Sequence, residues 1–288
     1  MSSYVYDAIN NILLIKEADA RRLNLFQNYC NVFHALIYYN MVVAWGDMPY
    51  LSQRQTDSGS RIVRTGKKTI FTNLETNLKN AIESLKEERN ESLNGEEGFF
   101  FVPKDVARII LAQIYMYQGD YNSATPLLEK VIKNGYYSLD NSNYSNLETL
   151  KAINSYSKEN ILSLRPQYIR NAEKGFKDYS SYSLPVLNYT DVMLLYAECM
   201  VHTGQATQAN NYLKQVVDAK HISVSDSGIT GIKEARQKLL LYSIGNFAFM
   251  KRNKLAITEY GIKDYQQLLP IPFSQIDLNP GMTQNLGY

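Results

Sequence analysis

Two stretches of the sequence decide the fold: DVARIILAQIYMYQGDYNSATPLLEKVIKN at residues 105–134 and TDVMLLYAECMVHTGQATQANNYLKQVVDA at residues 190–219. A constant offset of 85 positions aligns them, and small and apolar residues coincide along the alignment. The aligned pairs include Ala112 with Ala197, Gly119 with Gly204, Ala124 with Ala209 and Leu128 with Leu213. The chain therefore contains one structural unit twice.

Each copy predicts a helix, a turn at glycine and a second helix. In the second helix, apolar residues recur at i, i+3, i+4, i+7 and i+8, which places an apolar stripe on one helix face. The stripes are Ala124, Leu127, Leu128, Val131 and Ile132 in the first copy, and Ala209, Tyr212, Leu213, Val216 and Val217 in the second. Gly119 can supply the positive φ that ends a helix. Each copy is therefore a helical hairpin.

The first copy follows the tetratricopeptide (TPR) pattern of Leu-Ala, Tyr, Gly-Asp-Tyr and Ala. One such hairpin cannot bury its own apolar face, so several must stack. Apolar spacing predicts further helices over residues 19–45, 69–88 and 230–250, and long irregular connections at 51–68, 89–102, 136–188 and 253–288. Strand signals are few. We expect a mostly α protein, with TPR-like hairpins stacked in an α-α superhelix with long irregular loops, as a single domain over residues 1–288.

The composition indicates a globular protein. Of 288 residues, 45% are hydrophobic and 20% are charged, which is enough apolar residues to bury a sizeable core. The 30 basic and 28 acidic residues give a net charge of +2, which provides no field for nucleic acid or an anionic membrane. The sequence has no run of 18 apolar residues and no signal-peptide pattern at its start, so it predicts no membrane span.

The sequence offers no motif for catalysis, a cofactor or a metal. It has no GxGxxG, Walker A or GxSxG motif. His34, His202 and His221 share no metal-ligand spacing. Cys30 and Cys199 lie far apart, and we expect buried free thiols. We therefore predict no enzyme, no cofactor and no metal site.

Four motifs occur in order along the chain: LIYYNMVVAWGDMPYL at residues 36–51, the first hairpin within residues 102–139, LPVLNYTDVMLLYAE at 184–198, and LLPIPFSQIDLNPGMTQNLGY at 268–288. Together they resemble the SusD/RagB family of outer-membrane nutrient-binding lipoproteins. Two positions depart from the family pattern, because Asn188 and Asn246 stand where arginines are expected. The resemblance also implies that the chain is short for the family and lacks the N-terminal segment that would hold the lipidated cysteine.

The resemblance implies a protein on the cell surface of Bacteroidetes-type bacteria, lipid-anchored in the outer membrane. Such proteins capture glycans, or in some members peptides, for a TonB-dependent (SusC-like) transporter, and no catalysis is attributed to them. Membrane contact is then expected only through the lipid anchor, and no contact with nucleic acid is expected.

Tyrosines gather in the connection between the two hairpins, which is the family's variable insert. The chain has 23 tyrosines and one tryptophan, and seven of the tyrosines lie in residues 136–188. A pyranose ring can stack its apolar face on an aromatic ring, and its hydroxyls need polar partners. We predict ligand contacts at Tyr156, Arg165, Tyr168, Arg170, Tyr179 and Tyr182. Alternatively, the tyrosines hold a long loop against the helices, with the ring buried and the hydroxyl exposed to solvent.

Two functions therefore stay open. The first is a cell-surface glycan-binding protein that captures oligosaccharide or polysaccharide for a TonB-dependent outer-membrane transporter. The alternative is a TPR-like protein-interaction scaffold, or a peptide-binding member, with no sugar site of its own. A glycosidase would need two carboxylates facing one cleft, and the sequence contains no motif for that pair.

Overall fold

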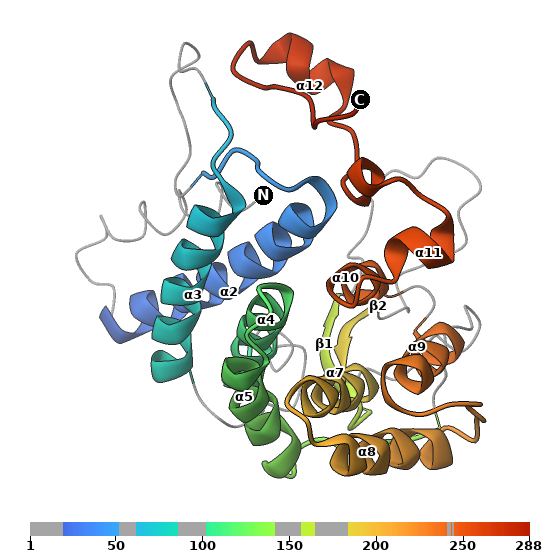
Figure 1. Ribbon diagram of the computed structural model, residues 1–288. Coiled ribbons are helices and arrows are strands. Elements are labelled where there is room, and N and C mark those ends of the chain that lie inside the picture. Colours follow the sequence, from blue (N-terminus) through green and yellow to red (C-terminus); the bar gives the residue numbers. More distant parts are fainter. Residues whose placement is uncertain are drawn as a thin grey trace, which may run out of the picture. The chain divides into compact units, whose positions relative to one another are not determined.

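The computed structural model describes residues 20–51, 62–85, 102–141, 157–164, 184–240, 243 and 245–288. These residues are mostly helical, as the sequence predicted (Figure 1). Contacts divide the chain into two compact units, one of Met1–Ile114 with Met250–Tyr288 and one of Tyr115–Phe249. The single domain over residues 1–288 stays a prediction.

The sequence repeat forms two helix–turn–helix hairpins. The first consists of α4 (Lys104–Tyr117) and α5 (Tyr121–Lys133), and the second of α7 (Tyr189–His202) and α8 (Ala206–Ala219). Both helices of the second hairpin begin 85 positions after their counterparts in the first. The predicted repeat is therefore confirmed at the level of helix boundaries.

The turns of the two hairpins share their hydrogen bonds as well. The N–H of Asp120 donates to the carbonyl of Tyr115 at 2.9 Å, and the N–H of Gln205 donates to the carbonyl of Met200 at 2.7 Å. The glycines before these donors have φ values of 84° at position 119 and 80° at position 204. Glycine adopts this left-handed conformation without a Cβ clash and commonly ends a helix in this way. Each turn thus follows from its glycine.

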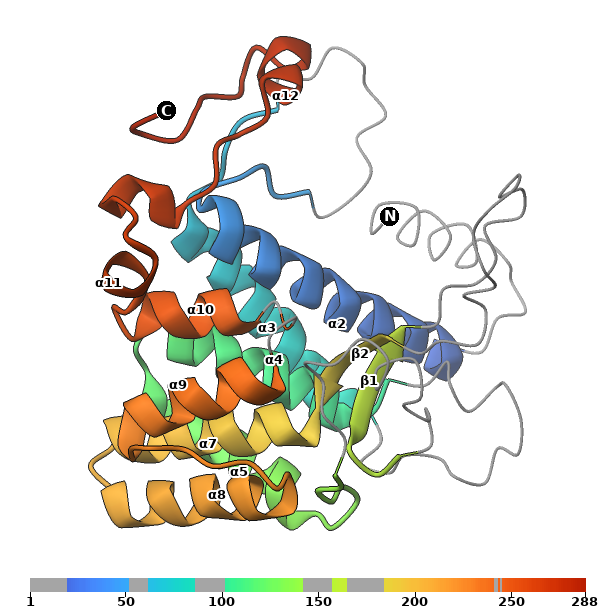
Figure 2. The same ribbon diagram turned by 90° about the vertical axis from the view of Figure 1, so that its right-hand side faces the viewer.

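The apolar stripes of α5 and α8 are buried in the second unit. The stripe residues with the least exposure are Ala124, Leu128 and Val131 on α5, and Ala209, Leu213 and Val216 on α8. Helix α7 packs against α5, α8 and α9 (Gly228–Leu239) (Figure 2). Every residue of α7 from Tyr189 to Met200 is buried, so α7 is the central helix of this unit.

Two long helices form the core of the first unit. Helices α2 (Ala20–Trp45) and α3 (Lys67–Ser84) pack against each other, and they confirm the predicted helices over 19–45 and 69–88. The buried residues of α3 recur at helical spacing: Ile70, Phe71, Leu74, Leu78 and Ala81. Amphipathic spacing of this kind is the signal that predicted the helix.

The C-terminal segment docks on the turn that follows α2. Buried Asn285 donates from Nδ2 to the carbonyls of Trp45 at 3.0 Å and Leu269 at 2.7 Å. Its Oδ1 accepts from Arg64 at 2.5 Å, and Arg64 also donates to the carbonyl of Asp47 at 2.8 Å. The first and last of the four motifs therefore bind each other and are structural.

Residues 230–250 form two helices, so the prediction of one helix there is wrong. Helix α9 ends at Leu239, and α10 (Gly245–Arg252) follows it. The carbonyl of Leu240 accepts from the N–H of Ser243 at 2.8 Å and from the side-chain amide of Asn246. These bonds use the carbonyl that a continuing helix would need, and the helix stops.

The connection over residues 253–288 is less irregular than the sequence predicted. It contains α11 (Ala256–Tyr260), the 3₁₀ helix η3 (Asp264–Gln267) and α12 (Phe273–Leu278). Helices of one or two turns are too short to show an apolar repeat at i, i+4 and i+7, so periodicity could not find them.

Gly204→Ala should lower the free energy of unfolding by about 1 kcal/mol, because alanine at a positive φ is strained. The strain is the only expected cost, since nothing lies within 4 Å of the added Cβ. Gly66→Ala is the matched control, because Gly66 has an equally open site but a φ of −60°. The control should be neutral or slightly stabilising. Urea unfolding measures both, and equal losses would contradict the turn geometry.

Candidate functional site

The connection between the two hairpins contains a two-stranded antiparallel sheet, whose second strand leads directly into α7. Strand β1 (Asn160–Leu164) pairs with β2 (Leu184–Asn188), and Leu164 is the partner of Leu184. The strands interrupt the connection over 136–188 that the sequence predicted to be irregular. Because Leu164 and Leu184 are partners, the segment 165–183 starts and ends at adjacent points.

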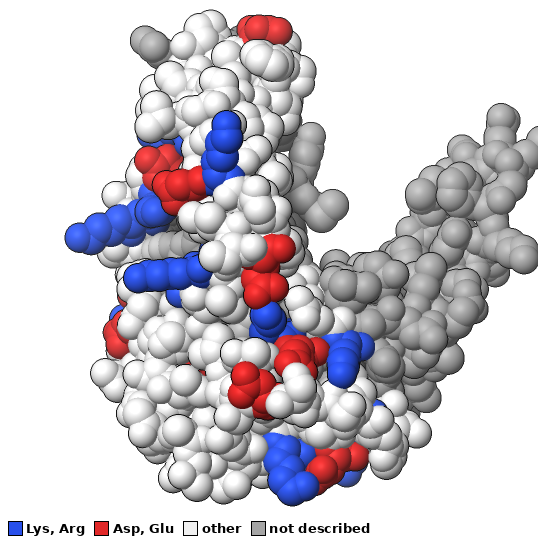
Figure 3. Space-filling model, turned by 45° about the vertical axis from the view of Figure 1, so that its right-hand side comes forward, with Lys and Arg blue, Asp and Glu red and all other residues white. Residues whose placement is uncertain are grey.

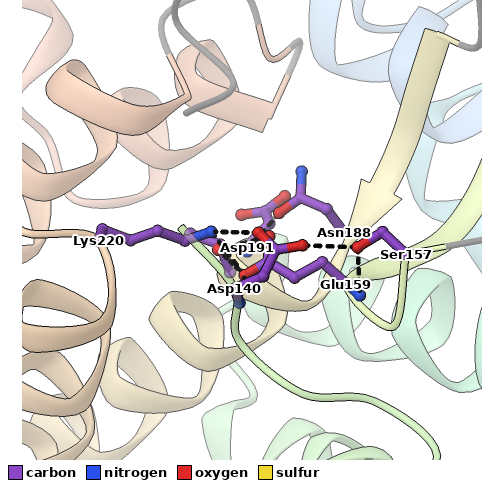
Figure 4. Close-up of polar contacts among 7 residues, drawn as sticks. Asp140, Ser157, Glu159, Asn188, Asp191 and Lys220 are labelled. Carbon is purple, nitrogen blue, oxygen red and sulfur yellow. Dashed lines mark hydrogen bonds and ion pairs between the residues drawn. The ribbon is translucent and has the colours of Figure 1, made fainter. Parts of the chain in front are cut away.

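A buried ion pair lies at the other end of this sheet. Lys220 follows the last residue of α8, and its Nζ lies 2.6 Å from Oε1 of Glu159 and 3.5 Å from Oδ1 of Asp140 (Figure 4). The side chains of Lys220 and Glu159 are both 0% exposed. The hydroxyl of Thr190, in the first turn of α7, donates to both carboxylate oxygens of Glu159 at 3.0 and 3.2 Å. Four segments of the chain therefore meet at one carboxylate.

Ser157 joins two of these segments more closely. Its hydroxyl donates to Oδ2 of Asp140 at 2.6 Å and accepts from the N–H of Glu159 at 3.1 Å. The N–H of Asp140 donates to Oε1 of Glu159 at 3.1 Å, and the carbonyl of Glu159 accepts from the N–H of Tyr189 at 2.8 Å. We call Asp140, Ser157, Glu159, Thr190 and Lys220 the insert clamp.

All six residues that the sequence predicted to bind ligand lie outside the described residues. They are Tyr156, Arg165, Tyr168, Arg170, Tyr179 and Tyr182. Tyr156 directly precedes Ser157 of the insert clamp, and the other five fall between β1 and β2 in the sequence. The described residues fix only where these segments begin and end, so their role in binding stays a prediction.

Sequence reasoning did not single out any member of the insert clamp as a functional residue. Lys220 lies just after a helix whose Lys214 and Asp218 are exposed, with side-chain exposures of 73% and 60%. Lysine is almost never fully buried unless it is paired, and its partner Glu159 lies far away in the sequence. No local pattern could therefore have marked Lys220 as buried.

Of the described tyrosines in the insert, one has a structural role. Tyr137 is buried, and its ring stacks on that of Tyr189 with the centroids 6.0 Å apart. For Tyr137 the structure supports the alternative in which tyrosine pins the loop onto the helices. Tyr136, its neighbour, is exposed.

Both asparagines that replace the expected arginines make specific hydrogen bonds. Asn188 caps α7, because its Oδ1 accepts from the N–H of Asp191 at 2.8 Å. Asn246 accepts from Nε of Arg236 at 3.1 Å. Arg236 is 1% exposed, and its Nη1 lies 2.5 Å from Oδ1 of Asp191. Asn188 and Asn246, the two positions that depart from the family pattern, therefore each bond to one partner of the buried ion pair between Asp191 and Arg236.

The described histidines and cysteines are not arranged for metal binding. Within the described ranges, no group of three or more His, Cys, Asp or Glu residues could hold a metal ion. Nε2 of His34 lies 3.1 Å from the carbonyl oxygen of Leu51, and burial lowers the pKa of His34. Cys30 and Cys199 are not joined in a disulfide, and burial raises the pKa of the Cys30 thiol to about 11. Such a thiol is protonated and unreactive at neutral pH.

Charged side chains of both signs are interspersed on the face drawn in Figure 3, in keeping with the net charge of +2. Interspersed charges do not build up the one-signed potential that attracts a polyanion.

Residues 71–219 match the sequence model of the SusD family, and the match covers more than half of the chain. The chain belongs to the SusD family. This is a family of cell-surface outer-membrane lipoproteins. No curated protein matches the sequence. Among the described helices of this SusD-family protein, none is both long and apolar enough to cross a membrane.

Solved structures of SusD-like proteins share the fold of almost the whole chain. Surface glycan-binding protein A from Bacteroides uniformis is 13% identical, with a TM-score of 0.77 over 99% of this chain and 82% of that chain. A laminarin-binding SusD-like protein is 20% identical, with a TM-score of 0.73 over 99% of this chain and 84% of that chain. Surface glycan-binding protein A from Bacteroides thetaiotaomicron, in complex with laminarihexaose, is 15% identical, with a TM-score of 0.73 over 98% and 84%. These likenesses confirm the predicted helical superhelix.

Asp191→Asn should lower the free energy of unfolding by about 3 kcal/mol, because it leaves the charge of Arg236 buried without a counter-charge. The control is Asp218→Asn, which removes the same charge from an exposed pair whose Nζ–Oδ2 distance is 2.8 Å. It should change the free energy by less than about 0.5 kcal/mol. Chemical unfolding compares the two, and a small loss for Asp191→Asn would show that the buried pair does not stabilise the unit.

Proposed function

We propose that this SusD-family protein binds glycan at the cell surface and delivers oligosaccharide or polysaccharide to a TonB-dependent transporter in the outer membrane. Its membership of the SusD family is the observation that carries the proposal. The fold that it shares with glycan-binding proteins, one of them in complex with laminarihexaose, supports it. The protein works by holding its ligand and catalyses no reaction.

The ligand site lies in the tyrosine-rich insert at residues 136–188. Tyr156, Tyr168, Tyr179 and Tyr182 offer aromatic rings for the apolar faces of pyranose units, and Arg165 and Arg170 offer donors for their hydroxyls. Two observations support this placement. The insert carries seven of the 23 tyrosines, and β1, β2 and the insert clamp anchor the points where its segments begin and end.

The transporter partnership follows from the family and has its own test. A tagged, lipid-anchored form of the protein, extracted from outer membranes in mild detergent, should co-purify with a TonB-dependent β-barrel transporter. Co-purification together with no binding to any polysaccharide would favour the protein-interaction scaffold over the glycan-binding protein.

A shortened insert gives the most specific test of the ligand site. Replacing residues 165–183 with Asn-Gly joins Leu164 to Leu184 through a two-residue hairpin turn, which suits directly paired strand residues. The variant should keep its helical content and melting temperature. Its affinity for the polysaccharide that binds wild type best should fall at least about tenfold, a loss of roughly 1.4 kcal/mol.

Two comparisons complete this experiment. Tyr168→Ala should weaken binding, whereas Tyr260→Ala should not, because Tyr260 is an exposed tyrosine in α11, outside the insert. Isothermal titration with laminarin, other polysaccharides and peptides measures each variant. Binding of the shortened variant at wild-type affinity would contradict the placement of the site in residues 165–183.

A further inference from the structure

The buried pair of Lys220 and Glu159 carries an inference that rests on the proposed function and deepens it. We infer that Lys220 is a positioning residue for glycan binding. Its ammonium group holds together the points where the insert leaves and rejoins the helical unit, and these points are the ends of the segments proposed to bind the ligand. Lys220 itself does not touch the ligand.

The chain passes through the clamp three times, at the start of the insert, within it and directly after it. It leaves α5 and reaches Asp140, it returns at Ser157 and Glu159 to enter β1, and after β2 it reaches Thr190 in the first turn of α7. Lys220 contacts the first two of these points directly, at 3.5 Å and 2.6 Å, and contacts the third through the carboxylate of Glu159. Figure 4 shows the lysine reaching this group from the residue after α8, on the side opposite the strand.

Both segments that carry the predicted ligand residues start or end at this clamp or at the sheet beside it. Residues 142–156 lie between Asp140 and Ser157, whose side chains are joined by a 2.6 Å hydrogen bond. Residues 165–183 lie between β1 and β2, and β1 begins directly after Glu159. A shift at Glu159 would therefore move the ends of both segments.

The hairpin fold itself does not require this lysine. The two hairpins align at an offset of 85 positions, and the counterpart of Lys220 in the first hairpin is Gly135. The counterpart of Thr190 is Asp105, which pairs with Arg108 of its own helix at 2.9 Å. One copy of the repeat therefore ends its second helix without any charge at this position, so the lysine serves something other than the hairpin.

Stability does not explain the charge either. Burying an ammonium and a carboxylate removes both from water, and an apolar pair of similar size is often at least as stable. A lysine ammonium has three directed donors, whereas apolar contacts have no preferred direction. The pair thus specifies one arrangement of Asp140, Glu159 and α8 where apolar packing would allow several. Preorganised binding loops gain affinity because less ordering remains to be done on binding.

The test removes the charges of Lys220 and Glu159 without leaving a cavity at their positions. The double variant Lys220→Met/Glu159→Gln keeps the side-chain volumes and retains an acceptor at position 159 for Thr190. The control is Lys214→Met/Asp218→Asn, which removes an exposed pair from the same helix α8. The probe is the polysaccharide that binds wild type best, and each variant is measured for affinity, melting temperature and hydrogen exchange.

The double variant should keep a melting temperature close to that of wild type, yet bind the polysaccharide at least about tenfold more weakly. Peptides from residues 142–156 and 165–183 should exchange faster, while those from α7 and α8 stay unchanged. The control variant should match wild type in all three measurements. If the pair had only a structural role, replacing it would lower the melting temperature and the affinity together.

Two results would overturn the inference: wild-type affinity in the double variant, or unchanged exchange in both insert peptides. The failure of the proposed function looks different, because wild type itself would then bind no polysaccharide. A double variant that is strongly destabilised is replaced by Asp140→Asn, which keeps the buried pair of Lys220 and Glu159 and weakens only the contact between Lys220 and the partly exposed Asp140. That single variant must still lose affinity for the inference to stand.

Discussion

Helix α7 is buried on every face, and this constraint shapes the second unit. All of its residues from Tyr189 to Met200 are shielded from solvent, and no single neighbour can cover such a helix. Helices α5, α8 and α9 and strand β2 all pack on it. Two copies of one hairpin supply much of this cover, because the apolar stripe of each second helix faces inward. The repeat is therefore a packing solution, in which each hairpin buries apolar surface that it could not bury alone.

Burial of α7 also buries the polar groups in its first turn, and each of them then needs a partner. Asp191 is paired with Arg236, and Thr190 with Glu159, whose charge Lys220 balances. These partners lie in α9, directly before β1 and directly after α8, so the first turn of α7 brings together segments that are distant in the sequence. The insert joins the helices at this same place. The polar groups that the fold must satisfy are thus the groups that anchor the proposed glycan-binding segments.

Local signals predicted the parts of the fold that local residues determine. The repeat could be found because Gly119 and Gly204, and Ala124 and Ala209, occupy equivalent positions in both hairpins. The end of α9 at Leu239 could not be predicted, since it depends on a hydrogen bond from the side chain of Asn246. Lys220 and Glu159 are 61 positions apart, and only the folded chain brings them together. Asn188 and Asn246 were recognised as departures from the family, but their capping and pairing roles needed coordinates. The six predicted ligand residues lie outside the described residues and stay predictions.

A crystal structure of the protein with a bound oligosaccharide tests most directly the claim that a helical unit anchors a sugar-binding insert. The oligosaccharide should derive from the polysaccharide with the highest affinity. Our account predicts a pyranose ring within about 4 Å of a tyrosine ring from residues 142–156 or 165–183. It also predicts that the ammonium of Lys220 still contacts Glu159 in that complex. A sugar bound to the helices alone, with no contact to either segment, would contradict the account.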